Sequence, residues 1–355
     1  LGAAHRLATR DRVGSLGIQR EDAAPGATEG GCLAVFLDVY GKLSIDRCFR
    51  GLSRTLPELA HDDALRDLAI VQGLPIISPH GHTDPAWFAS NEPFSDATEL
   101  LLKPDHYLFR MLYSQGVSLD ELGIGRSPRT ADENRSIWRT FARNYRLFRG
   151  TPSRIWLDTA FAEVFGLEVR LDETTADFYY DQIAAALARP AFRPRALFER
   201  FNIELLATTE SPLDSLAHHQ ALRDDPWPGQ VVTAYRPDPV VDPEFEGFKE
   251  NLKRFAELTG EDTHSWPGYL AAHRKRRAFF RALGATSTDH GHPSALTADL
   301  DEKAAAALFA RVQAGDCQAA DAELFRAQML TEMAAMSLDD GLVMQIHPGS
   351  FRNHN

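Results

Sequence analysis

The segment Pro75-Ile-Ile-Ser-Pro-His-Gly-His-Thr-Asp-Pro85 points to the fold. A short apolar run rich in β-branched residues ends in two histidines, His80 and His82. Residues i and i+2 of a strand point to the same face, so the two imidazoles stand side by side at the strand's carboxyl end. Together they can hold one divalent metal ion. His-x-His also arises often by chance, so the prediction draws on its context, in which Pro79 and Pro85 favour the exit of a strand.

The composition is that of a globular protein. The 355 residues suffice for one large α/β barrel or two domains, and 44% are apolar and 25% charged. The net charge of −12 argues against nucleic acid and anionic membrane surfaces as partners. Cys32, Cys48 and Cys317 are scattered and lack Cys-x-x-Cys spacing, which favours a reducing compartment, and we expect a cytoplasmic protein. The apolar stretch at residues 32–37 is too short to span a bilayer.

Five short apolar runs are typical of buried parallel strands. Each ends in polar residues, and a barrel of alternating strands and helices brings such strand ends into one mouth. The pattern therefore predicts a TIM-type (β/α)8 barrel. The five runs are Leu74–Pro79, Ile203–Thr208, Val231–Tyr235, Gly284–Asp289 and Leu342–His347.

Helical patterns fill the long connections between these strands. Residues 86–200 are too many for one crossover, so we expect a helical insertion after the first strand. Its predicted helices are Asp96–Leu102, Tyr107–Gln115, Ile137–Phe148, Phe178–Ala188 and Arg195–Phe201. Residues 242–281 are mainly helical, and residues 300–336 are interpreted as two helices joined around Gly315 and Asp316. We interpret the basic run 274–277 as a solvated helix face and the pair at 218–219 as surface histidines.

The two ends of the chain depart from this plan. Residues 1–44 mix Gly, Ala, Arg and Asp without periodicity, and we interpret them as a disordered or atypical extension. Residues 45–355 supply about five of the eight strands of a barrel, so three units, on the order of 100 residues, are missing. The abrupt stop at Arg352-Asn-His-Asn355 favours a chain truncated at its carboxyl end.

Seven motifs in a fixed order support a family resemblance. From about Ile45 to Asn355 the chain resembles the uronate isomerase (glucuronate isomerase) family of the amidohydrolase superfamily. The resemblance implies a barrel of the metal-dependent hydrolase kind. Glu210 stands where many members carry Asp, and the family's last three strands, with the Asp that completes its metal site, have no counterpart here. The motifs are Leu74–Pro85, Pro104–Met111, Phe148–Ser153, Ala207–Glu210, Tyr235–Asp238, Thr288–His292 and Gln345–Asn355.

The resemblance implies an aldose–ketose isomerase. Its members interconvert D-glucuronate with D-fructuronate, and D-galacturonate with D-tagaturonate, through an enediol. A divalent metal, expected to be zinc, stabilises the charge on the carbonyl oxygen and would be held by His80 and His82. The partners are then small-molecule hexuronates, and assembly into a homo-oligomer is left open.

Other candidates bind substrate or move its proton. Arg236 and Arg352 follow strands and suit the substrate's carboxylate, because a guanidinium forms two parallel hydrogen bonds with it, or they polarise its hydroxyls. Arg352 is also a catalytic candidate. By family resemblance His106 and Tyr107 lie over the substrate, where either serves in proton transfer or hydroxyl recognition. His347 stands at a strand end and is expected to face the mouth as a catalytic group.

Two alternatives compete with the isomerase reading. One is a mononuclear metal-dependent hydrolase of the same superfamily. A binuclear hydrolase is disfavoured, because none of the six lysines falls at a predicted strand end. The other alternative is an inactive fragment, since a barrel without three strands exposes two sheet edges.

Overall fold

The computed structural model describes residues 73–125 and 130–349. The predicted extension at residues 1–44 and Arg352 lie outside these residues. Within them, five strands form one parallel sheet in the order β1-β2-β3-β4-β5. Sequential order with helical crossovers is the topology of a TIM-type barrel, and the sheet is an incomplete one, as predicted. The strands are β1 (Ile76–Ser78), β2 (Ile203–Glu210), β3 (Gln230–Tyr235), β4 (Ser287–His290) and β5 (Val343–Ile346).

The strand ends differ from the prediction by a few residues. β4 begins at Ser287 and not at Gly284, because Gly284 has a φ of +100° and belongs to the turn before the strand. All four residues of β4 are buried, as expected for a strand covered on both faces.

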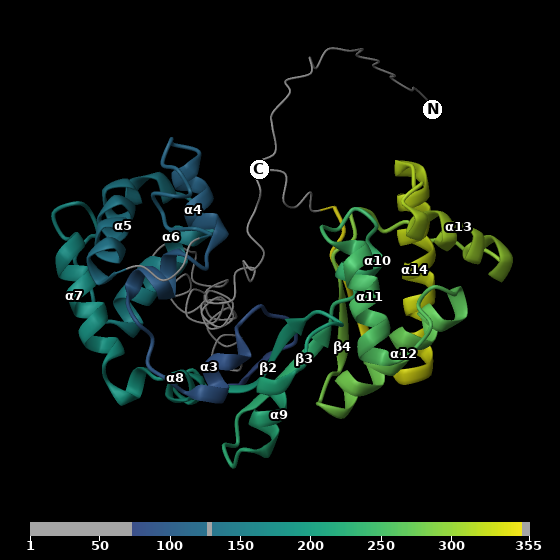
Figure 1. The fold of residues 1–355 in the computed structure, drawn as a ribbon. Helices are drawn as coiled ribbons and strands as arrows, with labels where there is room; N and C mark the ends of the chain where they lie inside the picture. The colour runs from purple at the N-terminus through teal and green to yellow at the C-terminus, as the bar shows by residue number, and fades with distance from the viewer. Residues whose placement is uncertain (1–72, 126–129, 350–355) are drawn as a thin grey trace, which may run out of the picture.

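The residues between β1 and β2 are helical and form a lobe of their own beside the sheet (Figure 1). Four of the five predicted helices are present with shifted ends, and the fifth, at 96–102, is a short π-helical turn. The lobe contains α3 (Pro85–Ser90), η1 (Thr98–Leu102), α4 (His106–Tyr113), α5 (Ala131–Asn144), η2 (Tyr145–Phe148), α6 (Pro152–Thr159), η3 (Ala160–Val164), α7 (Ala176–Leu187), η4 (Pro190–Phe192) and α8 (Pro194–Arg200).

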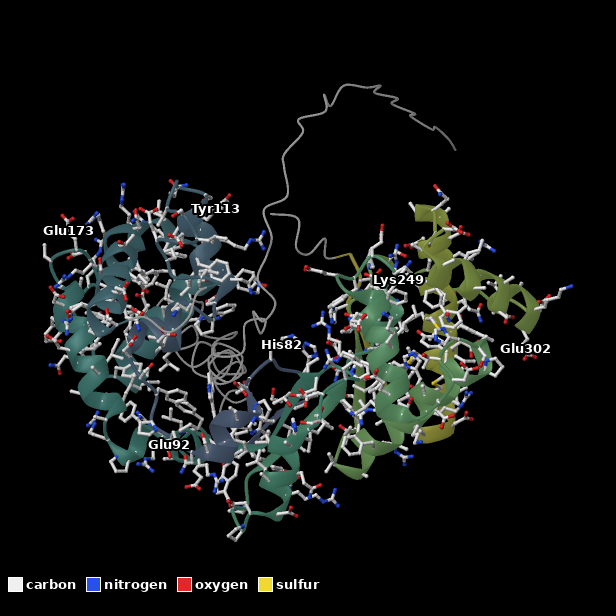
Figure 2. All side chains as sticks on the ribbon, viewed as in Figure 1. His82, Glu92, Tyr113, Glu173, Lys249 and Glu302 are labelled. Atoms are coloured by element: carbon white, nitrogen blue, oxygen red, sulfur yellow. The ribbon has the colours of Figure 1, made fainter. Side chains whose placement is uncertain are left out.

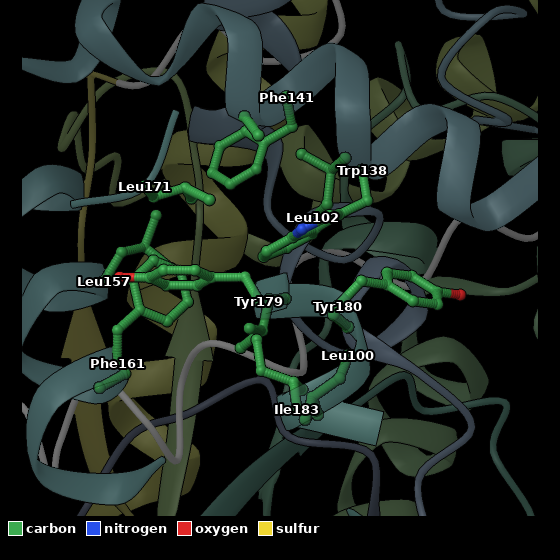
Figure 3. Close-up of a cluster of buried hydrophobic side chains, with 14 of the residues drawn as sticks. Leu100, Leu102, Trp138, Phe141, Leu157, Phe161, Leu171, Tyr179, Tyr180 and Ile183 are labelled. Carbon is green, nitrogen blue, oxygen red and sulfur yellow. The ribbon is translucent and has the colours of Figure 1, made fainter. Parts of the chain in front are cut away.

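Sequence features account for the ends of these helices. Thr130 and Glu133 form a capping box at the start of α5. Thr151 caps α6, and Pro152 occupies its first turn, a signal that sequence analysis overlooked. The inner faces enclose aromatic residues such as Trp138 and Phe161, shown in Figure 3.

The helices after β3 pack on the other side of the molecule around a second core, whereas the helix between β2 and β3 packs against α3. Gly315, in the left-handed conformation, ends the first helix of the pair predicted at 300–336. The helix between β2 and β3 is α9 (Ala217–Asp224), and those after β3 are α10 (Asp238–Val241), α11 (Phe248–Thr259), α12 (Trp266–Ala282), α13 (Glu302–Ala314) and α14 (Ala319–Asp340). No helix in the described part of the chain has both the length and the apolar composition to cross a membrane.

Two surface predictions are wrong in part, since Arg274 and Lys275 are exposed as predicted but their neighbours are not. Arg276 and Arg277 of the basic run are buried, and Arg277 binds Asp340 through two contacts of 2.6 and 2.9 Å. They lie on the inner face of α12, where a buried guanidinium requires such a partner. His219 is also buried, and its Nε2 lies 2.8 Å from Thr208 Oγ1, whereas its neighbour His218 is exposed as predicted.

Candidate active site

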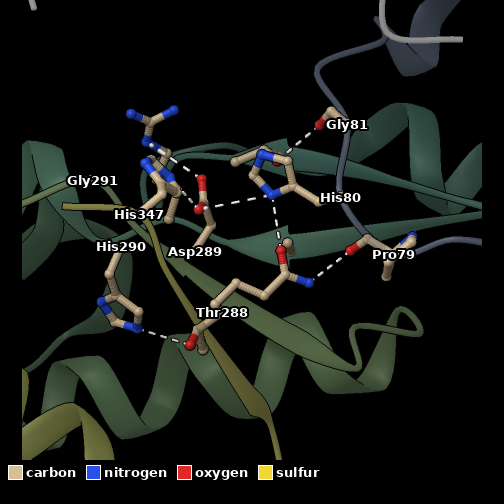
Figure 4. Close-up of polar contacts among 12 residues, drawn as sticks. Pro79, His80, Gly81, Thr288, Asp289, His290, Gly291 and His347 are labelled. Atoms are coloured by element: carbon tan, nitrogen blue, oxygen red, sulfur yellow. Dashed lines mark hydrogen bonds and ion pairs between the residues drawn. The ribbon is translucent and has the colours of Figure 1, made fainter. Parts of the chain in front are cut away.

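Polar side chains from three strand ends meet at the carboxyl edge of the sheet. His80 follows β1, Asp289 lies in β4, and His347 follows β5 (Figure 4). Each offers one potential ligand atom, and these three atoms lie within 4.8 Å of one another. Asp289 is fully buried, whereas the two imidazoles are about one third exposed. The parallel register thus brings together residues separated by more than two hundred positions.

Asp289 is the centre of this cluster. Its Oδ1 lies 2.6 Å from His347 Nε2 and 3.8 Å from His80 Nδ1. Its Oδ2 has no hydrogen-bond partner, although Arg236 Nε lies 3.7 Å away. A buried carboxylate oxygen without a hydrogen bond is costly, and a bound cation would compensate for it.

Gln345 orients the imidazole of His80. Its amide nitrogen donates to the carbonyl oxygen of Pro79 at 2.7 Å, so its Oε1 is left to accept from His80 Nδ1 at 2.8 Å. A proton on Nδ1 leaves the lone pair of Nε2 available to a metal. The cluster therefore offers nitrogen and oxygen donors of the kind that zinc and similar divalent ions bind.

Arg236 leaves β3 beside this cluster. Its backbone N–H donates to Glu210 O at 3.0 Å, which continues the pairing of β2 with β3 by one residue. Its Nε lies 2.9 Å from Asp238 Oδ2, nearer than Asp289. The second oxygen of Asp238 accepts the N–H of Gly291 at 3.2 Å.

The remaining predicted site residues are placed as follows. His82 lies at the centre of the molecule (Figure 2), and its ring centre is 5.0 Å from that of His80. It is outside the three-residue group, and its role as a ligand stays a prediction. His106 and Tyr107 begin α4 in the helical lobe with ring centres 4.2 Å apart, and Tyr107 is 55% exposed. Their position over a substrate also stays a prediction.

The start of α4 is fixed by a buried carboxyl. Asp105 Oδ1 accepts the N–H groups of Tyr107 and Leu108, at 2.8 and 3.4 Å. Burial raises the pKa of Asp105 to about 6, against the lowering effect of these two hydrogen bonds. This N-cap fixes where α4 begins and so orients His106 and Tyr107, its first two residues.

A second polar group lies between β2 and α9. Burial raises the pKa of Glu210 to about 8 and lowers the pKa of His219 to about 4. Glu210 Oε2 and His219 Nε2 are 3.7 Å apart, but at neutral pH these pKa values leave both groups uncharged. Thr233 donates to Glu210 across the strand pair.

His290 belongs to the opposite face of β4 from Asp289. Its Nε2 lies 2.8 Å from Thr288 Oγ1, and burial lowers its pKa to about 3. Burial also lowers the pKa of His292, whose two ring nitrogens have no hydrogen-bond partner. Neither imidazole belongs to the three-residue group.

Sequence reasoning assigned no role to Asp289, Gln345 or Asp238. A signal was present for two of them. Asp289 ends a predicted strand, and Gln345 lies two residues before His347 and so shares its face in a strand. Their partners come from other strands, and no local pattern identifies those.

The comparisons decide the family. Residues 60–355 match the family model described as glucuronate isomerase. The chain belongs to the glucuronate isomerase family. A uronate isomerase of Sphingopyxis alaskensis is 69% identical over 303 residues, which cover 83% of this chain and 64% of that protein. A uronate isomerase of Xanthomonas campestris pv. campestris is 63% identical over 313 residues, 84% of this chain and 66% of that protein.

Solved structures of the same family agree with the fold. The crystal structure of a glucuronate isomerase from Caulobacter crescentus superposes with a TM-score of 0.78 at 62% identity, covering 81% of this chain and 60% of that one. A uronate isomerase from Thermotoga maritima gives 0.75 at 26% identity, covering 82% and 63%. The chain thus spans less than two thirds of the length of the relatives it matches.

Proposed function

We propose that the protein is a uronate isomerase that interconverts D-glucuronate with D-fructuronate and D-galacturonate with D-tagaturonate. The observation that carries the proposal is the cluster of His80, Asp289 and His347 beside Arg236, in a chain of the glucuronate isomerase family. The reaction needs a group that moves a proton between two neighbouring carbons and positive charge near the carbonyl oxygen. Nitrogen and oxygen donors together with a guanidinium meet these needs. The scattered cysteines support a location in the cytoplasm.

The donors divide into metal ligands and substrate groups. We assign His80 and His82 to a divalent ion, with zinc as the first candidate, and Asp289, whose Oδ1 lies 3.8 Å from His80 Nδ1, as a further donor. When bound, the ion stabilises the negative charge that develops on the substrate's carbonyl oxygen. Gln345 accepts from His80 Nδ1, which leaves the lone pair of Nε2 available to the ion.

The other groups act on the open-chain sugar acid. Arg236, and Arg352 from its position five residues beyond His347, bind its carboxylate through paired hydrogen bonds. Asp289 holds the imidazole of His347 at 2.6 Å, which orients that ring for proton transfer. His106 and Tyr107 contact the sugar hydroxyls from the start of α4.

The test is conversion of D-glucuronate to D-fructuronate by the purified protein, with and without added zinc. We would assay both the 355-residue chain and the product of the complete gene, alongside ester, lactone and amide hydrolysis. His80→Asn in the active form should lower kcat/KM at least a hundredfold and lose bound zinc. His218→Asn, an exposed histidine on α9, is the matched control and should change neither.

The outcomes separate the candidate functions. Zinc-dependent isomerisation that is lost in His80→Asn supports the proposal. Hydrolysis without isomerisation by a folded, metal-loaded protein would replace it with a mononuclear hydrolase.

A further inference from the structure

We infer that Asp238 and Gly291 form a clamp that positions Arg236, and this inference rests on the proposed uronate isomerase function. The carboxylate of Asp238 contacts two loops at once. Its Oδ2 lies 2.9 Å from Arg236 Nε, and its Oδ1 accepts the backbone N–H of Gly291 at 3.2 Å. One side chain therefore ties the loop after β3 to the loop after β4.

Gly291 is needed at this point for space. A Cβ atom there would lie 2.8 Å from Asp238 Oδ2, 2.9 Å from Arg236 Nη2 and 3.1 Å from His347 Cε1. The backbone of Gly291 is outside the left-handed region that favours glycine, so its conformation would accept another residue. The absence of a side chain is what lets the loops after β3, β4 and β5 approach one another.

The clamp also decides which carboxylate holds Arg236. The Nε of Arg236 is 2.9 Å from Asp238 but 3.7 Å from Asp289, and all three side chains are at least 86% buried. A buried guanidinium needs a close carboxylate partner. Without Asp238, the contact of Nε with Asp289 at 3.7 Å is longer than a hydrogen bond, so Arg236 would be held less firmly and would compete for Oδ2, the oxygen of Asp289 that lacks a hydrogen bond. Asp238 is thus a positioning residue that keeps Arg236 directed to substrate and Asp289 available.

The experiment compares Asp238→Asn and Gly291→Ala with the unchanged product of the complete gene. One readout is KM and kcat for D-glucuronate. The other is the rate at which phenylglyoxal modifies Arg236, followed by mass spectrometry, which requires no activity. The expected result is a KM raised about tenfold with a smaller change in kcat, because a binding contact is weakened, together with several-fold faster modification of Arg236.

Asp225→Asn is the matched control. Asp225 holds Arg195 by two contacts of 2.9 and 3.0 Å, between α8 and the segment that follows α9. This change should speed modification of Arg195 and leave KM for D-glucuronate unaltered. Gly291→Ala serves as the second variant if Asp238→Asn folds poorly. The new Cβ atom would meet only the ends of side chains, which can move, so this variant is expected to fold.

Unchanged modification of Arg236 in both variants would overturn the clamp, as would modification that speeds up while KM stays constant. If the unchanged protein shows no isomerisation, the proposed function fails, and the modification rate of Arg236 still tests the clamp.

Discussion

At the scale of single residues, the candidate site depends on side chains that hold other side chains. Gln345 fixes the ring of His80, Asp289 holds His347, and Asp238 holds Arg236. Groups behind a ligand set its orientation and protonation, and their loss weakens a metal site without removing a ligand. Gln345 is the simplest of these to test, because the contacts of its amide are known. Its oxygen accepts from His80, and its nitrogen donates to Pro79.

Replacing Gln345 with Leu should weaken zinc binding roughly 10- to 100-fold, because His80 then loses the acceptor that fixes its tautomer. Chelator competition followed by metal analysis measures the change. Gln313→Leu is the control, since Gln313 also contacts a histidine Nδ1 at 3.3 Å and a carbonyl at 3.0 Å, but on the outer helices. Equal affinity in both variants would contradict the role of Gln345.

At the scale of elements, the interface of β2 and α9 encloses two titratable groups that are uncharged at neutral pH. Glu210 has its pKa raised to about 8, so the folded state keeps a proton that the unfolded state releases near its usual value of 4.5. Its contribution to stability is complete below 4.5 and is lost as the pH rises toward 8. For His219 the pKa is lowered to about 4, so stability is lost as the pH falls from 6.5 toward 4.

Between pH 6.5 and 8 only Glu210 of this pair changes its contribution, which gives a clear prediction. The melting temperature should fall as the pH rises through this window, and Glu210→Gln should remove part of that slope and raise the melting temperature at pH 8 by a few degrees. Differential scanning fluorimetry across the window measures both. Glu204→Gln, an exposed position on the same strand, should keep the slope of the unchanged protein. A Glu210→Gln slope that matches the unchanged protein would refute the buried, protonated state.

At the scale of the whole molecule, the sheet has two outer strands. Within the described residues, β1 and β5 each pair with one neighbour, and both carry exposed apolar side chains. Ile77 is 59% exposed and Val343 is 65% exposed. Unpaired strand edges with apolar residues are sites of association.

We therefore expect the 355-residue chain alone to bind the dye ANS, to associate with rising concentration and to lack turnover. The product of the complete gene should show much weaker dye binding. Light scattering coupled to size exclusion measures association, and Val343→Lys should reduce it. Val169→Lys, at a position 49% exposed in the helical lobe, should not. A monomeric 355-residue chain with full isomerase activity would contradict this expectation.

The sequence by itself determined the strands, most helices and the family. Apolar runs such as Ile203–Thr208, and histidines two apart after a strand, are local patterns that can be recognised without knowing the rest of the fold. Only the tertiary structure decided what Asp289, Gln345, His219 and Arg277 do, because burial and hydrogen bonding depend on partners far away in the chain. A carboxylate at the end of β4 becomes the centre of a site only when β1 and β5 bring imidazoles to it.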